Sequence, residues 1–297
     1  IKVLLVGQGV AAETLTDANG DFMLPVPASA WGKAAVRFRL ENTLWSITDP
    51  DSGKAYEWEA GSVQLPSRRP VPVGTFRLDP NTANGKIGYI QLQLLEAVDL
   101  FEREGLGMKW WPKRLKVLYP GGGDYFAPWS FTLNLTRPEA WDVNLHEFGH
   151  AVMDAGMNAR GGGGQHKIDE CYNEGLAWSE GWATFLAGAA HLSRDDEDAR
   201  FEFLVPRRAP IRIENVPADV CQGDKNEWRV SAGLWDLYDT HADGKDTGAL
   251  GFARIWSSLY KKPMGSFGEA FQLIAAGMKP EELAQAARLD GCNEFDV

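Results

Sequence analysis

The stretch His146-Glu147-Phe148-Gly149-His150 carries the residue types in this sequence that are most able to do chemistry. Two histidines four residues apart on a helix differ in direction by about 40°, so both imidazoles can reach one point beside the helix. This is the His-Glu-x-x-His pattern with which a helix binds a catalytic zinc ion. Glu147 can stand beside the metal as a general base without binding it. We therefore predict one zinc ion per chain, with His146 and His150 among its ligands.

The residues around the motif favour a helix over two histidines that meet by chance. Pro138 and Glu139 suit a first helical turn, and apolar side chains recur at helical spacing from Trp141 to Met153. Asp142 and Asp154 each lie four residues from one of the histidines. Either carboxylate could orient an imidazole, and the alternative for each is a solvated carboxylate on the helix face.

A catalytic zinc usually has three protein ligands and one open position for water. Residues 151–161 contain no histidine, so the candidates for the third ligand are carboxylates in the run 169–186, which we predict to be a second helix after the glycines at 161–164. Glu174 and Glu180 each begin a Glu-Gly-x-Ala unit in this run. Six residues apart on a helix, they would point about 120° apart and lie about 9 Å apart along the axis. The two are therefore not expected to bind the same ion.

The stretch Ser179-Glu180-Gly181-Trp182-Ala183-Thr184-Phe185 resembles a zinc-ligand stretch of the gluzincins, the metallopeptidases whose third ligand is a glutamate on the following helix. It is similar to Glu-Gly-Trp-Ser-Asp-Phe in fungalysins and to Asn-Glu-Gly-Phe-Ala-Thr in the aminopeptidase branch. The resemblance implies that Glu180 is the third zinc ligand. Asn173-Glu174 resembles the thermolysin Asn-Glu pair but departs from it afterwards, so Glu174 stays as the alternative ligand.

The stretch Leu234-Trp235-Asp236-Leu237-Tyr238 resembles a helix that flanks the site in fungalysins. Those enzymes carry a transition-state histidine shortly before this helix, whereas this chain has none between His191 and His241. The donor that stabilises the oxyanion would then be Tyr238 or His241, with Tyr238 preferred and His166 of the glycine-rich loop next. The alternatives are a packed aromatic for Tyr238 and a surface residue for His241.

Together these resemblances imply zinc-dependent hydrolysis of peptide bonds in a protein or peptide substrate. Glu147 would take the proton of the attacking water and pass it to the leaving amine. The Gly-x-Met-x-Asn element of the aminopeptidase branch is absent, so we expect an endopeptidase. The alternatives are an aminopeptidase with another anchor for the amino terminus, and a non-catalytic surface-binding protein. An intact Glu147 argues against the second alternative.

Length and charge limit the other possibilities. The chain has 297 residues, enough for one catalytic domain and one small module. Its net charge of −11 argues against nucleic-acid binding, and no apolar run approaches the roughly 20 residues of a membrane helix. The chain begins at Ile1 within a predicted strand, which is typical of a trimmed or mature chain, and we expect a secreted or extracellular protein. The oligomeric state cannot be predicted.

Three cysteines, Cys171, Cys221 and Cys292, form no Cys-x-x-Cys pair, so a structural Cys zinc site is not expected. Cys171 and Cys221 precede helices that should flank the metal. A disulfide between them and two separate buried thiols both remain open.

The predicted fold is α+β, with a small N-terminal β-sandwich module at 1–70 and a zincin-like catalytic domain at 71–297. Thr16-Asp17-Ala18-Asn19-Gly20-Asp21-Phe22 is a hairpin turn and resembles the carboxypeptidase-regulatory or transthyretin-like modules of secreted peptidases. Asp17, Asn19 and Asp21 could bind Ca²⁺, but the turn is the favoured interpretation. Residues 66–72 would be a stiff linker.

In the catalytic domain we predict a short mixed sheet, the active-site helix and a mainly helical C-terminal part. An amphipathic helix is expected at 87–105, followed by strands at 115–119 and 129–135. By resemblance to gluzincins, the second of these strands would form the sheet edge along which the substrate backbone pairs. A hairpin at 201–216 and helices at about 226–241, 248–260, 266–277 and 281–289 complete the prediction.

Overall fold

The computed structural model describes residues 1–7, 10–65, 70–159, 162–241 and 249–284. Its strands in chain order are β1 (Lys2–Gly7), β2 (Val10–Leu15), β3 (Gly32–Arg39), β4 (Trp45–Thr48), β5 (Glu57–Leu65), β6 (Leu115–Leu118), β7 (Tyr125–Ala127), β8 (Thr132–Asn134), β9 (Asn158–Ala159), β10 (Arg200–Phe201), β11 (Ile211–Arg212) and β12 (Pro263–Met264). Its helices are α1 (Ala83–Arg103), α2 (Trp141–Gly156), α3 (Glu174–His191), α4 (Glu227–Asp236), α5 (Phe252–Leu259) and α6 (Phe267–Ala275).

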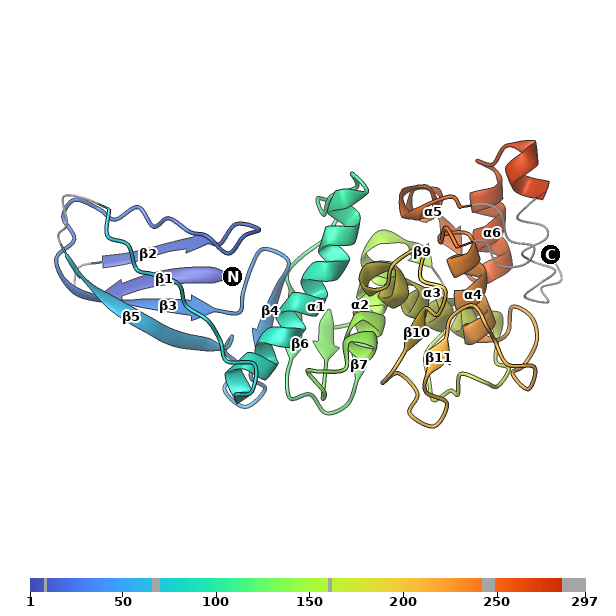
Figure 1. Cartoon of the computed structure of the whole chain (residues 1–297), viewed down its shortest axis with the longest axis horizontal. Coiled ribbons are helices and arrows are strands. Elements are labelled where there is room, and N and C mark those ends of the chain that lie inside the picture. The colour runs from blue at the N-terminus through green and yellow to red at the C-terminus, as the bar shows by residue number, and fades with distance from the viewer. Residues whose placement is uncertain (8–9, 66–69, 160–161, 242–248, 285–297) are drawn as a thin grey trace.

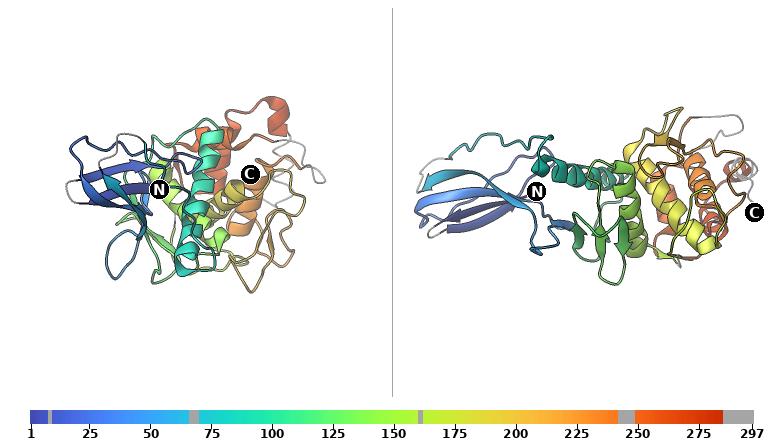
Figure 2. Two further views of the ribbon diagram at one scale, coloured as in Figure 1. Left: turned by 60° about the vertical axis from the view of Figure 1, so that its left-hand side comes forward. Right: turned by 90° about the horizontal axis from the view of Figure 1, so that it is seen from below.

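The molecule is elongated, with a β-sheet at one end and helices at the other (Figures 1 and 2). This mixture of small sheets and helices is the α+β class that the sequence predicts. Most of the predicted linker at 66–72 lies outside the described residues.

The N-terminal sheet is antiparallel and has the strand order β2-β1-β3-β5. Alternate residues of its strands point to one face, where Val3, Leu5, Val36 and Phe38 are buried. A turn forms after β2, where Asp17 Oδ1 accepts the backbone N–H groups of Asn19 and Asp21. These bonds are those of an Asx turn, which is the favoured interpretation of this stretch. The predicted hairpin does not form, because the next strand, β3, pairs with β1 and not with β2.

This part of the molecule differs from the predicted sandwich. Among the described residues it is one sheet, and its apolar face is covered by side chains of irregular segments, including Phe22, Leu24 and Phe76. The predicted boundary at residue 70 also fails to coincide with the division between the sheets. β4 lies within the predicted module but pairs with β6 of the second sheet, and the indole of its Trp45 donates a hydrogen bond to Gln91 of α1.

The second sheet has the order β4-β6-β8-β7. Its first three strands are parallel, and β7 runs antiparallel to β8. The predicted strand at 129–135 therefore becomes β8, which pairs on both sides. The expectation that this strand is the sheet edge is wrong, because β7, formed by the residues just before it, takes that position. β7 contacts α2, so the edge of this sheet lies beside the predicted active-site helix.

The helical part is built on α2, α3 and α4, which pack one against the next, with α1 across α2 and α3 (Figure 1). Two glycines allow the close approaches. A Cβ on Gly149 would stand 2.7 Å from the Cα of Ala183, and one on Gly181 would stand 2.4 Å from Val230. Large side chains fill the remaining space, among them the fully buried Trp178, Trp182, Trp228 and Trp235.

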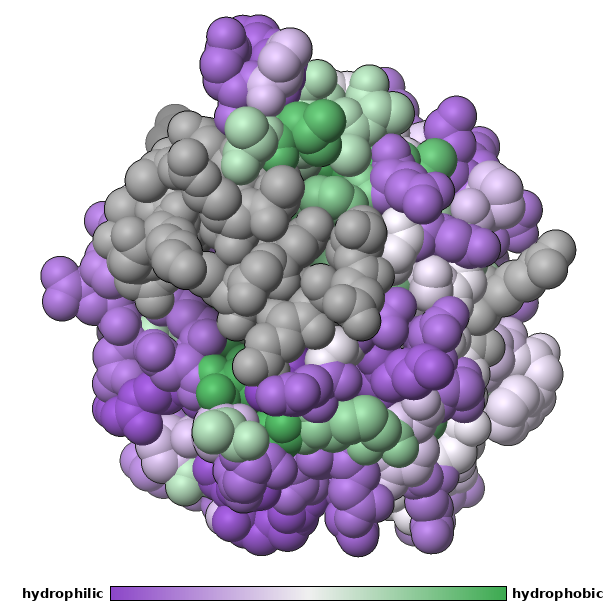
Figure 3. All heavy atoms as spheres, turned by 90° about the vertical axis from the view of Figure 1, so that its right-hand side faces the viewer, coloured by the Kyte–Doolittle hydropathy of each residue, from purple (hydrophilic) through white to green (hydrophobic). Residues whose placement is uncertain are grey.

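The C-terminal elements follow the prediction in outline. The hairpin forms as β10 and β11, and α5 and α6 correspond to the predicted helices at 248–260 and 266–277. The end of the predicted helix at 281–289 lies outside the described residues. On the face seen in Figure 3, hydrophilic residues predominate and apolar ones form separate patches. None of the helices in the described ranges combines the length and apolar character needed to cross a bilayer.

Candidate metal centre and its cavity

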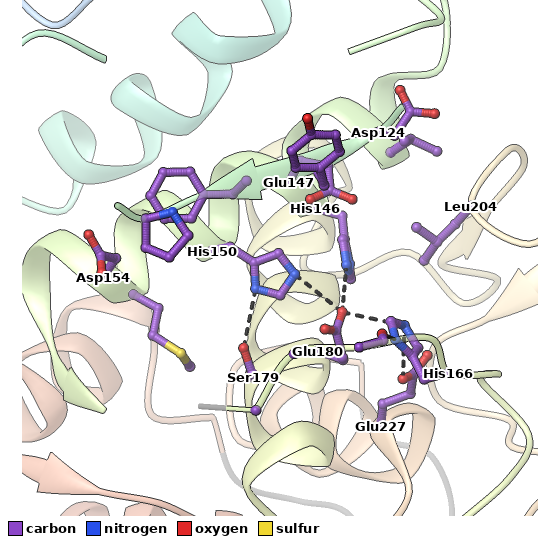
Figure 4. A pocket seen from close by; sticks show the side chains of 18 of the residues that line it. Asp124, His146, Glu147, His150, Asp154, His166, Ser179, Glu180, Leu204 and Glu227 are labelled. Carbon is purple, nitrogen blue, oxygen red and sulfur yellow. Dashed lines mark hydrogen bonds and ion pairs between the residues drawn. The ribbon is translucent and has the colours of Figure 1, made fainter. Parts of the chain in front are cut away.

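The two motif histidines converge on one carboxylate oxygen. Nε2 of His146 lies 3.0 Å from Oε2 of Glu180, and Nε2 of His150 lies 3.2 Å from the same oxygen. The histidines project from α2 and Glu180 from α3, so the contact of these helices brings the three side chains together (Figure 4). Glu180 is almost completely buried. Burial alone would raise the pKa of its carboxyl, but the charge and hydrogen bonds of His150 and His146 hold that pKa well below the usual range.

The far ring nitrogen of each histidine meets a hydroxyl group of α3. Nδ1 of His146 lies 3.0 Å from Oγ1 of Thr184, and Nδ1 of His150 lies 3.3 Å from Oγ of Ser179. When a hydroxyl accepts the hydrogen of Nδ1, the lone pair of Nε2 is free for a metal ion. The hydroxyl groups therefore orient both rings toward the point that Glu180 also faces.

A zinc ion fits this group of residues. Ligand atoms of His146, His150 and Glu180 all lie within 4.8 Å of one another. Zinc bonds of about 2.0–2.2 Å in a tetrahedron put neighbouring ligand atoms roughly 3.4 Å apart, close to the separations found here. Two imidazoles and one carboxylate are also ligand types that zinc takes in catalytic sites.

Glu147 lies on α2 and lines the same cavity, which has a volume of about 750 Å³. Burial raises the pKa of its carboxyl, while the neighbouring histidines act in the opposite direction. Other parts of the wall come from β7 and the turn after it, from the 162–166 loop, and from Leu204 and Val205. The cavity thus joins the metal-binding side chains, a buried carboxyl group and the edge strand of the second sheet.

His166 and Glu227 lie on the far side of Glu180 (Figure 4). Nε2 of His166 is 3.5 Å from Oε2 of Glu180 and 3.4 Å from Oε2 of Glu227. Glu227 belongs to the first turn of α4, and burial raises its pKa to about 8. From the sequence, His166 was only the third candidate for the donor that stabilises the oxyanion, and no role was predicted for Glu227. An acidic residue at a helix start usually faces solvent near the helix dipole, so its type and position gave no sign of a site.

The two donors preferred from the sequence do not reach this cavity. Tyr238 is fully buried, and its hydroxyl lies 3.4 Å from the carbonyl oxygen of Ala189, between the rings of Phe185 and Trp235. His241 is half-buried and lies in a separate group with Glu214 and Asp239. Neither residue lines the cavity. Tyr238 instead packs against Phe185 and Ala189 of α3, so the stretch that resembles a site-flanking helix turns this phenol into the core.

The remaining sequence candidates take structural positions. Asp142 is completely buried, and its Oδ2 accepts the backbone N–H groups of Glu202, Phe203 and Leu204 rather than an imidazole. It therefore holds the segment that forms one wall of the cavity. Asp154 lines the cavity, but it is Ser179 whose hydroxyl meets Nδ1 of His150, so Asp154 does not orient this imidazole. Glu174 is exposed and lies 3.7 Å from Lys225.

Cys171 and Cys221 are joined by a disulfide, with their Cα atoms 5.4 Å apart. This bond connects the segment before α3 to the segment before α4. Asp169 strengthens the same region by pairing with Arg207 and Arg208, and its carbonyl oxygen accepts the N–H of Cys221. The loop that bears His166 and the helix that bears Glu227 are thus tied together close to the metal centre.

The family model of the mycolysin C-terminal domain matches residues 102–280. The match covers more than half of the chain, and the chain belongs to this family. It places the protein among peptidase-related chains, suggests a relation to thermolysin-like metallopeptidases and indicates a metal, typically zinc. The matched range contains every residue that lines the cavity, and the N-terminal sheet lies outside it. No curated protein matches the chain.

Proposed function

We propose that this protein is a secreted zinc-dependent peptidase that cleaves internal peptide bonds. The observation that carries the proposal is the convergence of His146 and His150 on Glu180, with Glu147 in the same cavity. His146, His150 and Glu180 would hold one zinc ion. When bound, this ion supplies a Lewis acid that polarises a carbonyl group and lowers the pKa of a water molecule.

The side chains of the chain itself perform the remaining steps. Glu147 accepts a proton from the water that attacks the peptide carbonyl, and then delivers it to the leaving amine. Burial of this carboxyl raises its affinity for a proton, which suits both transfers. Thr184 and Ser179 keep the imidazoles oriented while the charge in the site changes.

A hydrogen-bond donor for the developing oxyanion must lie in the cavity. Tyr125 lines the cavity and carries a phenol hydroxyl that no described residue bonds. Arg137, which also lines it, is within 3.7 Å of Asp124 and so is already paired. We therefore assign the donor role to Tyr125 in place of Tyr238 and His241.

The edge strand β7 supports cleavage within a chain. An extended substrate can pair with the free edge of β7 beside α2, which brings its backbone across the cavity. The exposed Trp129 at the turn after β7 would contact substrate side chains. The N-terminal module contributes no residue to the cavity wall, so we assign it no catalytic group. The disulfide supports an extracellular location, where oxidising conditions preserve such bonds.

The test is hydrolysis of an unfolded protein and of a peptide with a blocked amino terminus, each with and without a metal chelator. An endopeptidase cleaves both, and the chelator abolishes both reactions. Cleavage of only unblocked peptides would replace the proposal with an aminopeptidase. Hydrolysis that survives complete removal of the metal would exclude the zinc mechanism.

A further inference from the structure

We propose that this peptidase prefers substrates with an arginine or lysine near the cleaved bond, and that the carboxylate of Asp154 selects this side chain. The inference rests on the proposed function, because it concerns the substrate of the same cavity. Asp154 lies on α2, lines the cavity and is exposed there. Ser179, and not Asp154, meets the imidazole of His150, so this carboxylate is left for another partner.

Asp154 and Leu204 lie at opposite ends of the cavity, with the metal-binding side chains between them (Figure 4). Helical residues four apart share a face, so Asp154 lies one turn, or about 6 Å, beyond His150 along α2. A substrate that crosses the cavity in extended form therefore brings side chains from one side of the cleaved bond to Leu204 and from the other side to Asp154. An extended chain advances about 3.3 Å per residue, which places the selected side chain within about two residues of the bond.

The other carboxylates of the cavity already have partners or a place in the metal centre. Asp124 accepts hydrogen bonds from the backbone and hydroxyl of Thr136 and pairs with Arg137. The glutamates of the cavity belong to the catalytic group or face His166. In the part of the chain that the structure describes, Asp154 receives no hydrogen bond and forms no ion pair. Its carboxylate is therefore open to a cationic group of the substrate.

Lys113 acts on Asp154 electrostatically but does not occupy it. Its Nζ lies over the ring of Phe131, 5.4 Å from the ring centre. Partial removal of water raises the pKa of the Asp154 carboxyl, and the charge of Lys113 lowers that pKa without a hydrogen bond. A guanidinium or ammonium group that bonds the carboxylate directly would replace the missing water and add a charge-assisted hydrogen bond.

An exposed aromatic residue and the charge of the wall also favour a cation. Trp129 lines the cavity and is 83% exposed. An indole ring attracts the charged end of arginine or lysine and packs against its methylene groups. Among the described residues that line the cavity, carboxylates outnumber the single arginine, Arg137. The net charge of −11 on the chain draws cationic peptides toward this surface.

The test compares peptides that differ in the charge of one side chain. A series with blocked amino termini carries arginine, its uncharged analogue citrulline, or glutamate at one position at a time on each side of a single cleavable bond. We expect the zinc-loaded wild type to show kcat/KM about tenfold higher for arginine than for citrulline, within about two residues of the bond and on one side only. The ratio should fall as salt is added, because ions screen the pair.

Variants assign the preference to Asp154. Asp154→Asn keeps the shape of the side chain and removes its charge, so the ratio of arginine to citrulline should fall to about one. Asp154→Lys should invert the preference, with glutamate favoured over citrulline at the same position. Asp51→Asn removes the same charge from an exposed turn outside the cavity and should keep the wild-type ratio. Zinc content, measured for each chain, separates selection of the substrate from loss of the metal.

Two results would overturn the preference. One is an equal rate for arginine and citrulline at every position in the wild type, and the other is an unchanged ratio in Asp154→Asn. Both would leave the proposed function intact, because the peptides are still cleaved. A zinc-loaded wild type that cleaves none of the peptides would instead refute the proposed function, and the preference with it. Asp154→Lys serves where Asp154→Asn fails to fold, and the wild-type comparison needs neither variant.

Discussion

Gly149 lies so close to Ala183 that a Cβ on the glycine would stand 2.7 Å from the Cα of Ala183 and 3.0 Å from its carbonyl oxygen. Gly149 is the residue before His150 on α2, and Ala183 is three residues after Glu180 on α3. The distance between these two backbones therefore sets the distance between the histidines and the glutamate. The small residue within the motif is a packing requirement of the metal centre.

Gly149→Ala should move α2 away from α3. Because the nearest atoms are backbone atoms, they cannot rotate aside, and we expect a loss of stability of about 1–3 kcal/mol. The separation of His146 and His150 from Glu180 should grow, so zinc affinity should fall as well. Thermal unfolding and zinc titration measure the two effects. Gly122→Ala is the control, since a Cβ there meets nothing within 4 Å. Equal stability and zinc affinity in the two variants would show that the close approach does not position the ligands.

The helix that carries the histidine motif could be predicted from the sequence. The spacing of His146 and His150 requires only helical geometry, and the helix forms where apolar residues recur at helical spacing. Resemblance selected Glu180 over Glu174, and the structure brings Glu180 to both imidazoles. The assignment of the ligand itself is a prediction for experiment.

Features that depend on tertiary packing were not predictable. Tyr238 stands in a stretch that resembles a site-flanking helix, but the face of that helix which meets α3 buries its hydroxyl. Glu227 reaches the cavity only because Gly181 lets α4 approach α3. β4 belongs to the second sheet and not to the predicted N-terminal module, because its backbone pairs with β6 and its Trp45 packs with α1. Each of these outcomes is decided by a partner far away in the sequence.

Replacing Glu180 and Glu174 one at a time shows which of the two carboxylates is the zinc ligand. Glu180→Gln removes the charge that faces both imidazoles and should abolish tight zinc binding. Glu174→Gln changes an exposed residue at the start of the same helix and should bind zinc like the wild type. Metal analysis after dialysis measures both. Loss of zinc from the Glu174 variant alone would transfer the ligand role to Glu174.

Glu147→Gln should keep the fold and the zinc but lose nearly all hydrolysis. The amide has the shape of the carboxyl group but cannot accept the proton of water, and loss of a general base costs roughly a hundredfold to ten-thousandfold in rate. Turnover of a blocked peptide and metal content, measured on the same preparation, check this expectation. A variant with full zinc content and near-normal turnover would eliminate Glu147 as the base.

Two tyrosines provide a matched test of the oxyanion donor. Tyr125→Phe removes a hydroxyl from the cavity, and we expect kcat to fall by about a hundredfold, as for other single donors. Tyr238→Phe removes a hydroxyl from the core beside Ala189, and kcat should stay near the wild-type value. Steady-state kinetics with verified zinc content compare them. The reverse pattern would return the role to Tyr238, and His241→Ala completes the comparison.

Asp169 gives a pH-dependent prediction about the region that supports His166. Its hydrogen bonds with Arg207 and then Arg208 hold the pKa of its carboxyl well below the usual value of about 3.9, against a smaller effect of burial. A lowered pKa in the folded state stabilises the fold above the ordinary pKa, and this contribution is lost as the pH falls below it. Asp169→Asn should therefore lower stability by about 1 kcal/mol at pH 7.

The difference in the free energy of unfolding between Asp169→Asn and the wild type should stay constant from pH 7 to about pH 5, and it should shrink progressively below about pH 4. Thermal unfolding of both metal-free chains across this range measures it, because removal of the metal separates the effect from acid release of zinc. Asp51→Asn, in an exposed turn, should match the wild type throughout. A stability difference for Asp169→Asn that grows toward low pH would mean that the carboxylate is not held in its charged form by the two arginines.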